Sequence, residues 1–180
     1  MDIFTVNNKK EKKFLEQKTL AFDFAKFSKG DSAELIKKMR ALMVTADGIG
    51  LAANQVGLNL RVFVAQIQKK DRRGNQRTLS GAEEKFYAIF NPKIIKFGAE
   101  KTIEEEGCLS VPETFGMVER VEKIKLVGFD KNGKKIKIKA WGLLARVFQH
   151  EVDHLNGILF TDKAKNIQKI IPASKNIAKN

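Results

Sequence analysis

Two histidines and a glutamate stand at a spacing suited to metal chemistry. His150 and His154 are the only histidines in the 180-residue sequence, and Glu151 directly follows the first of them. Residues four apart share one face of a helix, so both imidazoles can bind one divalent metal ion. The glutamate can then act as a general base beside the ion. The pattern is typical of metal-dependent hydrolases, although an H-E-x-x-H sequence also occurs by chance on ordinary helices.

The single cysteine supplies a third candidate ligand. Because Cys108 is the only cysteine, the chain cannot form an intramolecular disulfide, and this favours a reducing compartment. Gly107 and the nearby Pro112 indicate a turn or an irregular strand that could present the thiolate. A lone cysteine is more often a small buried hydrophobic residue. Two imidazoles and a thiolate would, however, leave the fourth position of a tetrahedral metal open to water, as catalysis requires.

A glycine-rich segment is the third feature that could take part in binding or catalysis. Residues 48–57 read Gly-Ile-Gly-Leu-Ala-Ala-Asn-Gln-Val-Gly. The glycines allow tight turns and a close approach of the backbone, and Gln55 offers an amide donor. No Lys-Ser/Thr pair follows the glycines, which argues against a phosphate-binding loop. A packed turn with an incidental glutamine is the simpler interpretation of the segment alone.

Hydrophobic periodicity predicts the elements that must position these residues. Asp31 and Glu34 suggest a capping box that opens a helix, which Asp47-Gly48 ends. Residues 61–67 and 86–90 read as buried strands, and Asn91-Pro92 is expected to stop the second. Residues 69–85 suit a polar surface loop.

The motif itself is expected on a helix that faces the core. Residues 123–127 and 135–139 alternate apolar residues with lysine around an Asn132-Gly133 turn, which predicts a half-exposed hairpin. A helix then runs from Gly142 to a stop at Asn156-Gly157, and its apolar stripe contains His150 and Glu151. Strands before a core helix indicate an α+β fold, with antiparallel or mixed sheets packed around this central helix.

Composition favours one domain over residues 1–180, with a core of about 31–162 and a lysine-rich tail from 163 to 180. No stretch is apolar enough to cross a membrane, so we expect a cytoplasmic protein without a membrane partner. The net charge of +13 fits either attraction to a polyanion such as ribosomal RNA or a solvated lysine-rich surface. No motif for specific nucleic-acid binding accompanies it.

Taken together, three segments resemble the peptide deformylase family. Its motifs G-x-G-L-A-A-x-Q, E-G-C-L-S and Q-H-E-x-D-H correspond to residues 48–55, 106–110 and 149–154, in the same order and without gaps. The resemblance implies a bacterial hydrolase that removes the N-formyl group from the formylmethionine of nascent polypeptides and releases formate. It also leaves open a transient association with the ribosome.

The resemblance further implies a role for each matching residue. Cys108, His150 and His154 would bind one metal ion, natively Fe(II), which Zn(II), Ni(II) or Co(II) can replace. Metal-bound water would lose a proton to Glu151 and attack the formyl carbon. Donors for the developing oxyanion would be the Gln55 side chain and the Leu109 backbone N–H. The substrate would be bound by Ile49, Gly50, Gly107 and Val147.

The sequence also suggests two ion pairs near the site and leaves two alternative functions to consider. Arg146 is expected to pair with Glu104 at the pocket rim, and Arg120 with Asp153. A thermolysin-like peptidase would take its third ligand from a later acid, for which only Asp162 is available. A non-enzymatic RNA-binding protein would use the basic surface, but every residue needed for the chemistry is still present.

Overall fold

A computed structural model of the chain describes residues 1–68 and 84–170, so most of the loop expected at 69–85 lies outside the described residues. The elements, in chain order, are α1 (Lys9–Leu15), α2 (Lys29–Thr45), β1 (Gly50–Ala52), the 3-10 helix η1 (Ala53–Val56), β2 (Val62–Gln68), β3 (Glu84–Phe97), β4 (Lys101–Cys108), β5 (Val111–Val121), β6 (Lys123–Phe129), β7 (Lys135–Trp141), α3 (Gly142–Leu155), the 3-10 helix η2 (Phe160–Asp162) and β8 (Lys165–Lys169).

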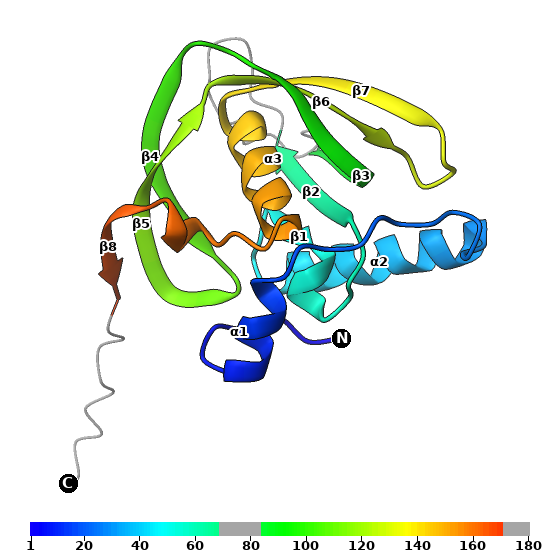
Figure 1. Ribbon diagram of the computed structural model, residues 1–180, viewed down its shortest axis with the longest axis horizontal. Coiled ribbons are helices and arrows are strands. Elements are labelled where there is room, and N and C mark those ends of the chain that lie inside the picture. The colour runs from blue at the N-terminus through cyan, green and yellow to red at the C-terminus, as the bar shows by residue number, and fades with distance from the viewer. Residues whose placement is uncertain (69–83, 171–180) are drawn as a thin grey trace, which may run out of the picture.

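Two antiparallel sheets surround the helix that carries the metal motif. One sheet has the strand order β1-β2-β3-β6-β7 and the other the order β4-β5-β8. Helix α3 lies between the larger sheet and the long β4–β5 hairpin (Figure 1). Its Phe148 and Leu155 are fully buried against Phe63 and Leu126 of the larger sheet. The predicted α+β fold with a central motif-bearing helix is therefore confirmed.

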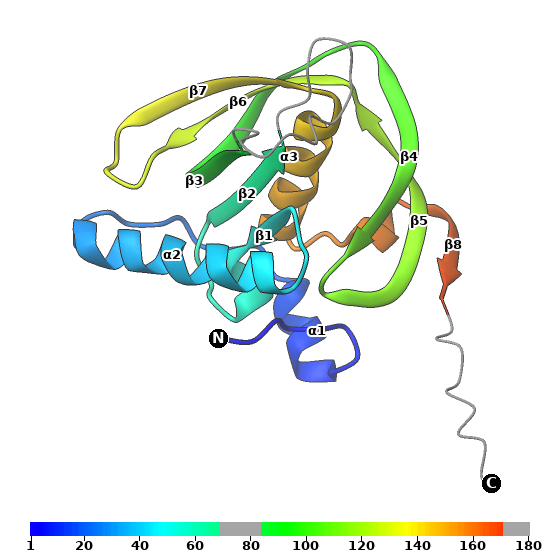
Figure 2. The ribbon, with the colours of Figure 1, turned by 180° about the vertical axis from the view of Figure 1, so that it is seen from behind.

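Helix α2 packs on the other side of the larger sheet, where Met39 and Met43 are fully buried (Figure 2). The helix ends close to the predicted Asp47-Gly48 stop, but the predicted capping box is wrong. The Ser28 hydroxyl accepts the Asp31 N–H at 3.1 Å, and the Asp31 carboxylate accepts the Ser28 N–H at 2.9 Å. Asp31 is therefore the third helical residue and not the cap, because the Ser28 hydroxyl accepts one of the free N–H groups of the first turn.

Strand β3 continues through Asn91 and Pro92, where the sequence predicts it to stop. The pairing with β6 shifts register between Phe90 and Lys93, which marks a bulge. Asn91 takes the left-handed conformation there, with φ of 49°. Its side chain accepts the Phe22 N–H at 2.7 Å and donates to the Phe22 carbonyl at 2.9 Å. The bulge absorbs the proline, so the strand bends instead of ending.

We expect Asn91→Ala to destabilise the protein by about 2–4 kcal/mol, because it removes two part-buried hydrogen bonds and leaves a left-handed backbone on a less tolerant residue. Urea unfolding monitored by circular dichroism measures the change. Asn132→Ala is the matched control, since Asn132 is exposed on the β6–β7 turn and its φ is not positive. Equal stability of the two variants would contradict the structural role of the Asn91 side chain.

Helix α3 and the β6–β7 hairpin have the predicted bounds within two residues. Gly142 opens α3 with φ of 57°, and Gly157 follows its end with φ of 75°. Both values favour glycine, because a side chain crowds the backbone in this region. From Val147 onward the predicted stripe faces inward, and Val147, Phe148 and Glu151 are buried, but Leu143 at its start is 40% exposed.

Segments outside residues 31–162 also pack onto the fold. Leu15 and Phe22 are buried, and the Phe4 N–H donates to the Gln55 carbonyl at 2.8 Å. Residues 165–169, which the sequence places in the lysine-rich tail, form strand β8 and pair with β5. Residues 171–180 of that tail lie outside the described residues. Over the part of the chain that is described, no helix has the length and apolar character needed to span a membrane.

Candidate active site

The structure brings the three predicted metal ligands together. The Cys108 Sγ lies 3.1 Å from the His154 Nε2, which lies 3.2 Å from the His150 Nε2. The three ligand atoms all lie within 4.8 Å of one another. A thiolate and two imidazoles match the donor preference of divalent transition metals such as iron and zinc. The cluster therefore fits one metal ion.

Local structure explains how Cys108 reaches the helix. Cys108 is the last residue of β4, and the pairing with β5 shifts register between Gly107 and Cys108. This irregularity confirms the predicted turn-like presentation of the thiol. The Ser110 N–H and the Gln55 side-chain amide lie 3.4 Å and 3.5 Å from the sulfur. Both donors favour the negatively charged thiolate.

The charges of the cluster favour a metal-binding state of the cysteine. Burial by itself would raise the pKa of Cys108, but the charge of His154 and the hydrogen bond with His150 outweigh it and hold the pKa well below its usual range. Burial would also lower the pKa of His150, whereas its hydrogen bonds with Cys108 and Glu106 raise that pKa to about 10. The thiolate is the form in which cysteine binds a metal.

Glu151 lies beside the cluster on the same helix. The side chain is buried, and its Oε2 atom has no hydrogen-bond partner among the described residues. Burial raises the pKa of Glu151 to about 7, an effect that the nearby His150 and His154 partly oppose. A carboxyl group that titrates near neutrality can accept and return a proton, which suits general acid–base catalysis.

The absence of a side chain at Gly50 makes room for the Glu151 carboxylate. A Cβ on residue 50 would collide with the Glu151 Oε1 atom. We expect Gly50→Ala to lower catalytic efficiency by about 100-fold, because small displacements of a catalytic group cost this much. Steady-state kinetics on a formylated peptide checks this result. Gly30→Ala is the control, because a Cβ there meets only the Ser28 hydroxyl at an ordinary 3.5 Å. A fully active Gly50→Ala protein would contradict the requirement for this space.

Glu106 is the central acid of the site, and sequence reasoning missed its role. Its carboxylate accepts a hydrogen bond from the Arg120 Nε at 2.9 Å and another from the Arg146 guanidinium at 2.8 Å. The carboxylate also lies 3.0 Å from the His150 Nδ1. Burial would raise the pKa of Glu106, but these bonds with His150 and Arg120 hold it well below its usual range. The ionised carboxylate fixes the His150 ring so that Nε2 points to the cluster.

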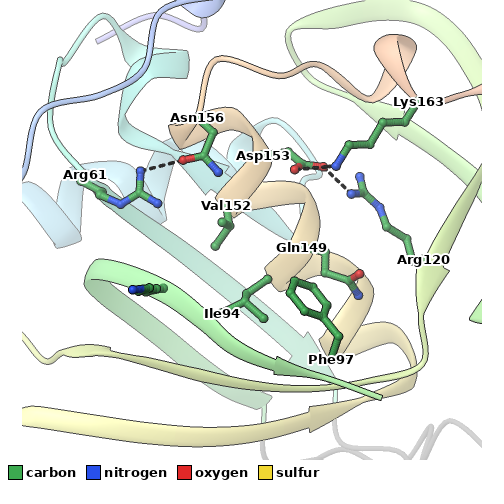
Figure 3. Close-up of a pocket in the computed structure, with 10 residues that line it drawn as sticks. Arg61, Ile94, Phe97, Arg120, Gln149, Val152, Asp153, Asn156 and Lys163 are labelled. Carbon is green, nitrogen blue, oxygen red and sulfur yellow. Dashed lines mark hydrogen bonds and ion pairs between the residues drawn. The ribbon is translucent and has the colours of Figure 1, made fainter. Parts of the chain in front are cut away.

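Asp153 extends this ionic network along α3. Its carboxylate accepts from Arg120, as predicted, and also from the Lys163 amine at 2.6 Å (Figure 3). These residues line a pocket of about 260 Å³ that also contains Val152 and Gln149. Arg120 therefore joins Asp153 to Glu106, and through Glu106 to the predicted ligand His150.

The second predicted ion pair is also confirmed. The Arg146 Nε lies 3.1 Å from the carboxylate of Glu104, which is half exposed. Arg146 itself is buried, and its guanidinium also donates to the Thr102 and Val118 carbonyls at 3.0 Å and 2.9 Å. It therefore anchors α3 to both strands of the β4–β5 hairpin.

A pocket of about 600 Å³ opens beside the cluster. Its lining includes every residue predicted to bind substrate or an oxyanion, namely Ile49, Gly50, Gln55, Gly107, Leu109 and Val147. The Gln55 Oε1 accepts the Ala52 N–H at 2.8 Å, which directs its Nε2 to Ser110 and Cys108. Asp162 takes no part in the cluster; its carboxylate accepts the Leu159 N–H. A thermolysin-like ligand set is therefore excluded.

Comparisons with known proteins agree with this geometry. Residues 2–170 match the family described as polypeptide deformylase. The chain is 43% identical to a peptide deformylase of Symbiobacterium thermophilum over 138 residues, which are 76% of this chain and 57% of that protein. It is 44% identical to the Halothermothrix orenii enzyme over 133 residues, 74% of this chain and 77% of that one. The chain belongs to the peptide deformylase family.

Solved peptide deformylases share the fold. A probable peptide deformylase from Synechococcus phage S-SSM7 superposes with a TM-score of 0.75 at 39% identity, covering 91% of this chain and 99% of that one. A Met-Ala-Ser-bound class I type b peptide deformylase from Acinetobacter baumannii gives a TM-score of 0.77 at 31% identity, with coverages of 91% and 97%. Members of this family are metal-dependent hydrolases that remove the N-formyl group from nascent peptides.

Proposed function

We propose that this chain, acting as a single catalytic domain, hydrolyses the formyl amide of formylmethionyl polypeptides to formate and a free amine. The observation that carries the proposal is the convergence of Cys108, His150 and His154 next to the buried Glu151, whose Oε2 has no hydrogen-bond partner among the described residues. Family membership supports the reaction, and the pocket beside the cluster supports a peptide substrate.

Cys108, His150 and His154 would hold the metal through Sγ and the two Nε2 atoms. We assign Fe(II) as the native ion on the basis of family membership. Zn(II), Ni(II) or Co(II) would be able to replace it, because the mixed thiolate and imidazole set suits all four. When bound, the ion supplies Lewis acidity, which polarises the formyl carbonyl and acidifies water. Glu106 keeps His150 oriented toward the ion throughout the reaction.

Glu151 moves the proton in this proposal. Its carboxylate takes a proton from the attacking water and returns it to the amine nitrogen as the bond from carbon to nitrogen breaks. The Gln55 Nε2 and the Leu109 backbone N–H donate to the developing oxyanion. The bond of the Gln55 Oε1 to the Ala52 N–H turns Nε2 toward the cluster, which supports this role. Such preorganised donors lower a barrier by about 3–4 kcal/mol.

The pocket walls would select the substrate. Ile49, Gly50 and Gly107 offer backbone groups to an extended peptide, and Val147 contacts the methionine side chain at the base of the pocket. The Met-Ala-Ser bound to the Acinetobacter relative corresponds to a deformylated peptide start, which supports the same mode here. Because nascent chains are the substrate, we place the protein in the cytoplasm of a bacterial cell, in transient contact with ribosomes.

Formate release from formyl-Met-Ala-Ser tests this function. Protein purified without oxygen and loaded with Fe(II) or Ni(II) should release formate, and removal of the ion with a chelator should abolish release until metal is restored. An N-acetyl-Met-Ala-Ser peptide is the matched substrate control. Well-folded, metal-loaded protein that released no formate would refute the proposal.

A further inference from the structure

One face of the larger sheet gathers lysines that the catalytic site does not use. In β6 and β7 inward-facing residues, which are buried or half-buried, alternate with outward-facing ones, and the outward positions are rich in lysine. We call this surface the lysine face. It consists of Lys96 on β3, Lys123 and Lys125 on β6, and Lys135, Lys137 and Lys139 on β7. The opposite face of the same strands packs against α3 through Ile124, Leu126 and Ala140.

The strand register places like charges directly opposite each other. Lys125 on β6 pairs with Lys139 on one side and with Lys96 on the other. Like charges at such positions destabilise a sheet. Lysines on β7, an edge strand, also prevent unwanted strand pairing, but Lys125 and Lys96 lie on interior strands where this explanation fails. The row of three lysines therefore needs another cause.

Few acids neutralise this surface. Among the residues that the structure describes, only Lys123 of the lysine face has an ion-pair partner, Glu100 at 3.1 Å. Successive outward residues of one strand lie about 6.6 Å apart, and neighbouring strands about 4.8 Å. The lysine face therefore presents a two-dimensional array of largely uncompensated positive charge.

An exposed aromatic ring completes the surface. Trp141, the single tryptophan of the chain, is 68% exposed and pairs with Lys123 at the end of β7. It therefore lies on the outward face with the lysines. Leu143, two residues later, lines the active-site pocket. Trp141 therefore lies two residues along the chain from the lining of that pocket.

We propose that the lysine face and Trp141 bind single-stranded RNA through its phosphate backbone, with one base stacked on the indole ring. Basic strands beside an exposed aromatic side chain have the chemistry that sequence-independent single-strand binding requires. This inference rests on the proposed function for its context, because RNA exposed on the ribosome surface would hold the enzyme near emerging formylated chains.

The test measures binding of a fluorescein-labelled 20-nucleotide oligouridine by fluorescence anisotropy between 50 and 200 mM KCl. The full chain is compared with the triple variant Lys125→Gln/Lys137→Gln/Lys139→Gln. We expect the triple variant to bind about 10- to 100-fold more weakly at 100 mM salt, and its slope of log K against log salt to be smaller by about 2. The control, Lys10→Gln/Lys13→Gln/Lys37→Gln, removes the same charge from exposed positions on α1 and α2.

Trp141 provides a second, independent signal. Because the chain has no other tryptophan, quenching of its intrinsic fluorescence by the oligonucleotide reports on this surface alone. We expect quenching in the unmodified and control proteins and its loss in the Lys125/Lys137/Lys139 variant. All three proteins should deformylate formyl-Met-Ala-Ser equally, so failure of RNA binding is distinguishable from failure of the enzymatic assignment.

Three outcomes of the RNA experiments would overturn the inference. They are no binding by the unmodified protein at 50 mM salt, equal weakening in both triple variants, and binding without tryptophan quenching. Sedimentation with phosphatidylserine vesicles in the absence of RNA binding would also overturn it, and would assign the lysine face to a membrane surface.

Discussion

Glu151→Gln is expected to lower formate release by about 10²–10⁴-fold while leaving metal binding intact. The amide keeps the size of the side chain but cannot accept the proton from water. Stability should stay equal or increase, because the native carboxylate is buried with an unpaired oxygen, and a neutral group loses less solvation on burial. Formate release, metal content by mass spectrometry and thermal unfolding together measure the three effects.

Glu34→Gln makes the same chemical change on the exposed face of α2, where Glu34 pairs with Lys38, and should leave activity unchanged. Retained activity in the Glu151 variant would remove the proton-transfer role. Loss of activity together with loss of the metal would instead assign Glu151 to the structure of the site.

Glu106→Gln is expected to destabilise the protein by about 3–5 kcal/mol, because it removes one charge from a buried network that contains Arg120 and Arg146. For a chain of this length the melting temperature should fall by roughly 10 °C. Metal affinity should fall about 10- to 100-fold, since His150 loses the carboxylate that orients it. Thermal unfolding and titration against a competing chelator measure these changes.

Glu104→Gln provides a matched comparison two residues earlier on the same strand. Glu104 also pairs with Arg146 but is half exposed, so its loss should cost about 0–1 kcal/mol and leave metal affinity unchanged. If the Glu104 and Glu106 variants behaved alike, the burial of the network would not be the source of its stabilising effect. Unchanged metal affinity in Glu106→Gln would refute the orienting role.

The metal cluster could be predicted because its signals are local. The spacing of His150 and His154 fixes their common helix face, and the apolar stripe of α3 fixes that face toward the core. The Cys108 strand end follows from the neighbouring glycine. The role of Glu106 could not be predicted in this way, since residues 104–106 are all glutamate. Only the depth of β4 against α3, a tertiary property, separates the buried Glu106 from its exposed neighbours.

Strands β3 and β8 differ from the predicted elements for the same reason. Each depends on contacts with residues that are distant in the sequence. Strand β3 passes Asn91 because that side chain binds the backbone of Phe22, 69 positions earlier in the sequence. Strand β8 forms from residues with no strand signal because β5 offers a free edge to Lys165–Lys169. Local propensity is a weak guide where pairing with a remote segment supplies the hydrogen bonds.

Helix α3 is enclosed by the two sheets, and this burial bears on how a metal ion would enter and leave the candidate site. Ten of its fourteen residues are buried, so the helix has almost no face from which it can fray independently of the sheets. Amide exchange along it should therefore follow global unfolding. If the proposed metal site is correct, His150 and His154 would keep their places when an ion left through the pocket, and the cluster would retain the arrangement needed to bind another ion.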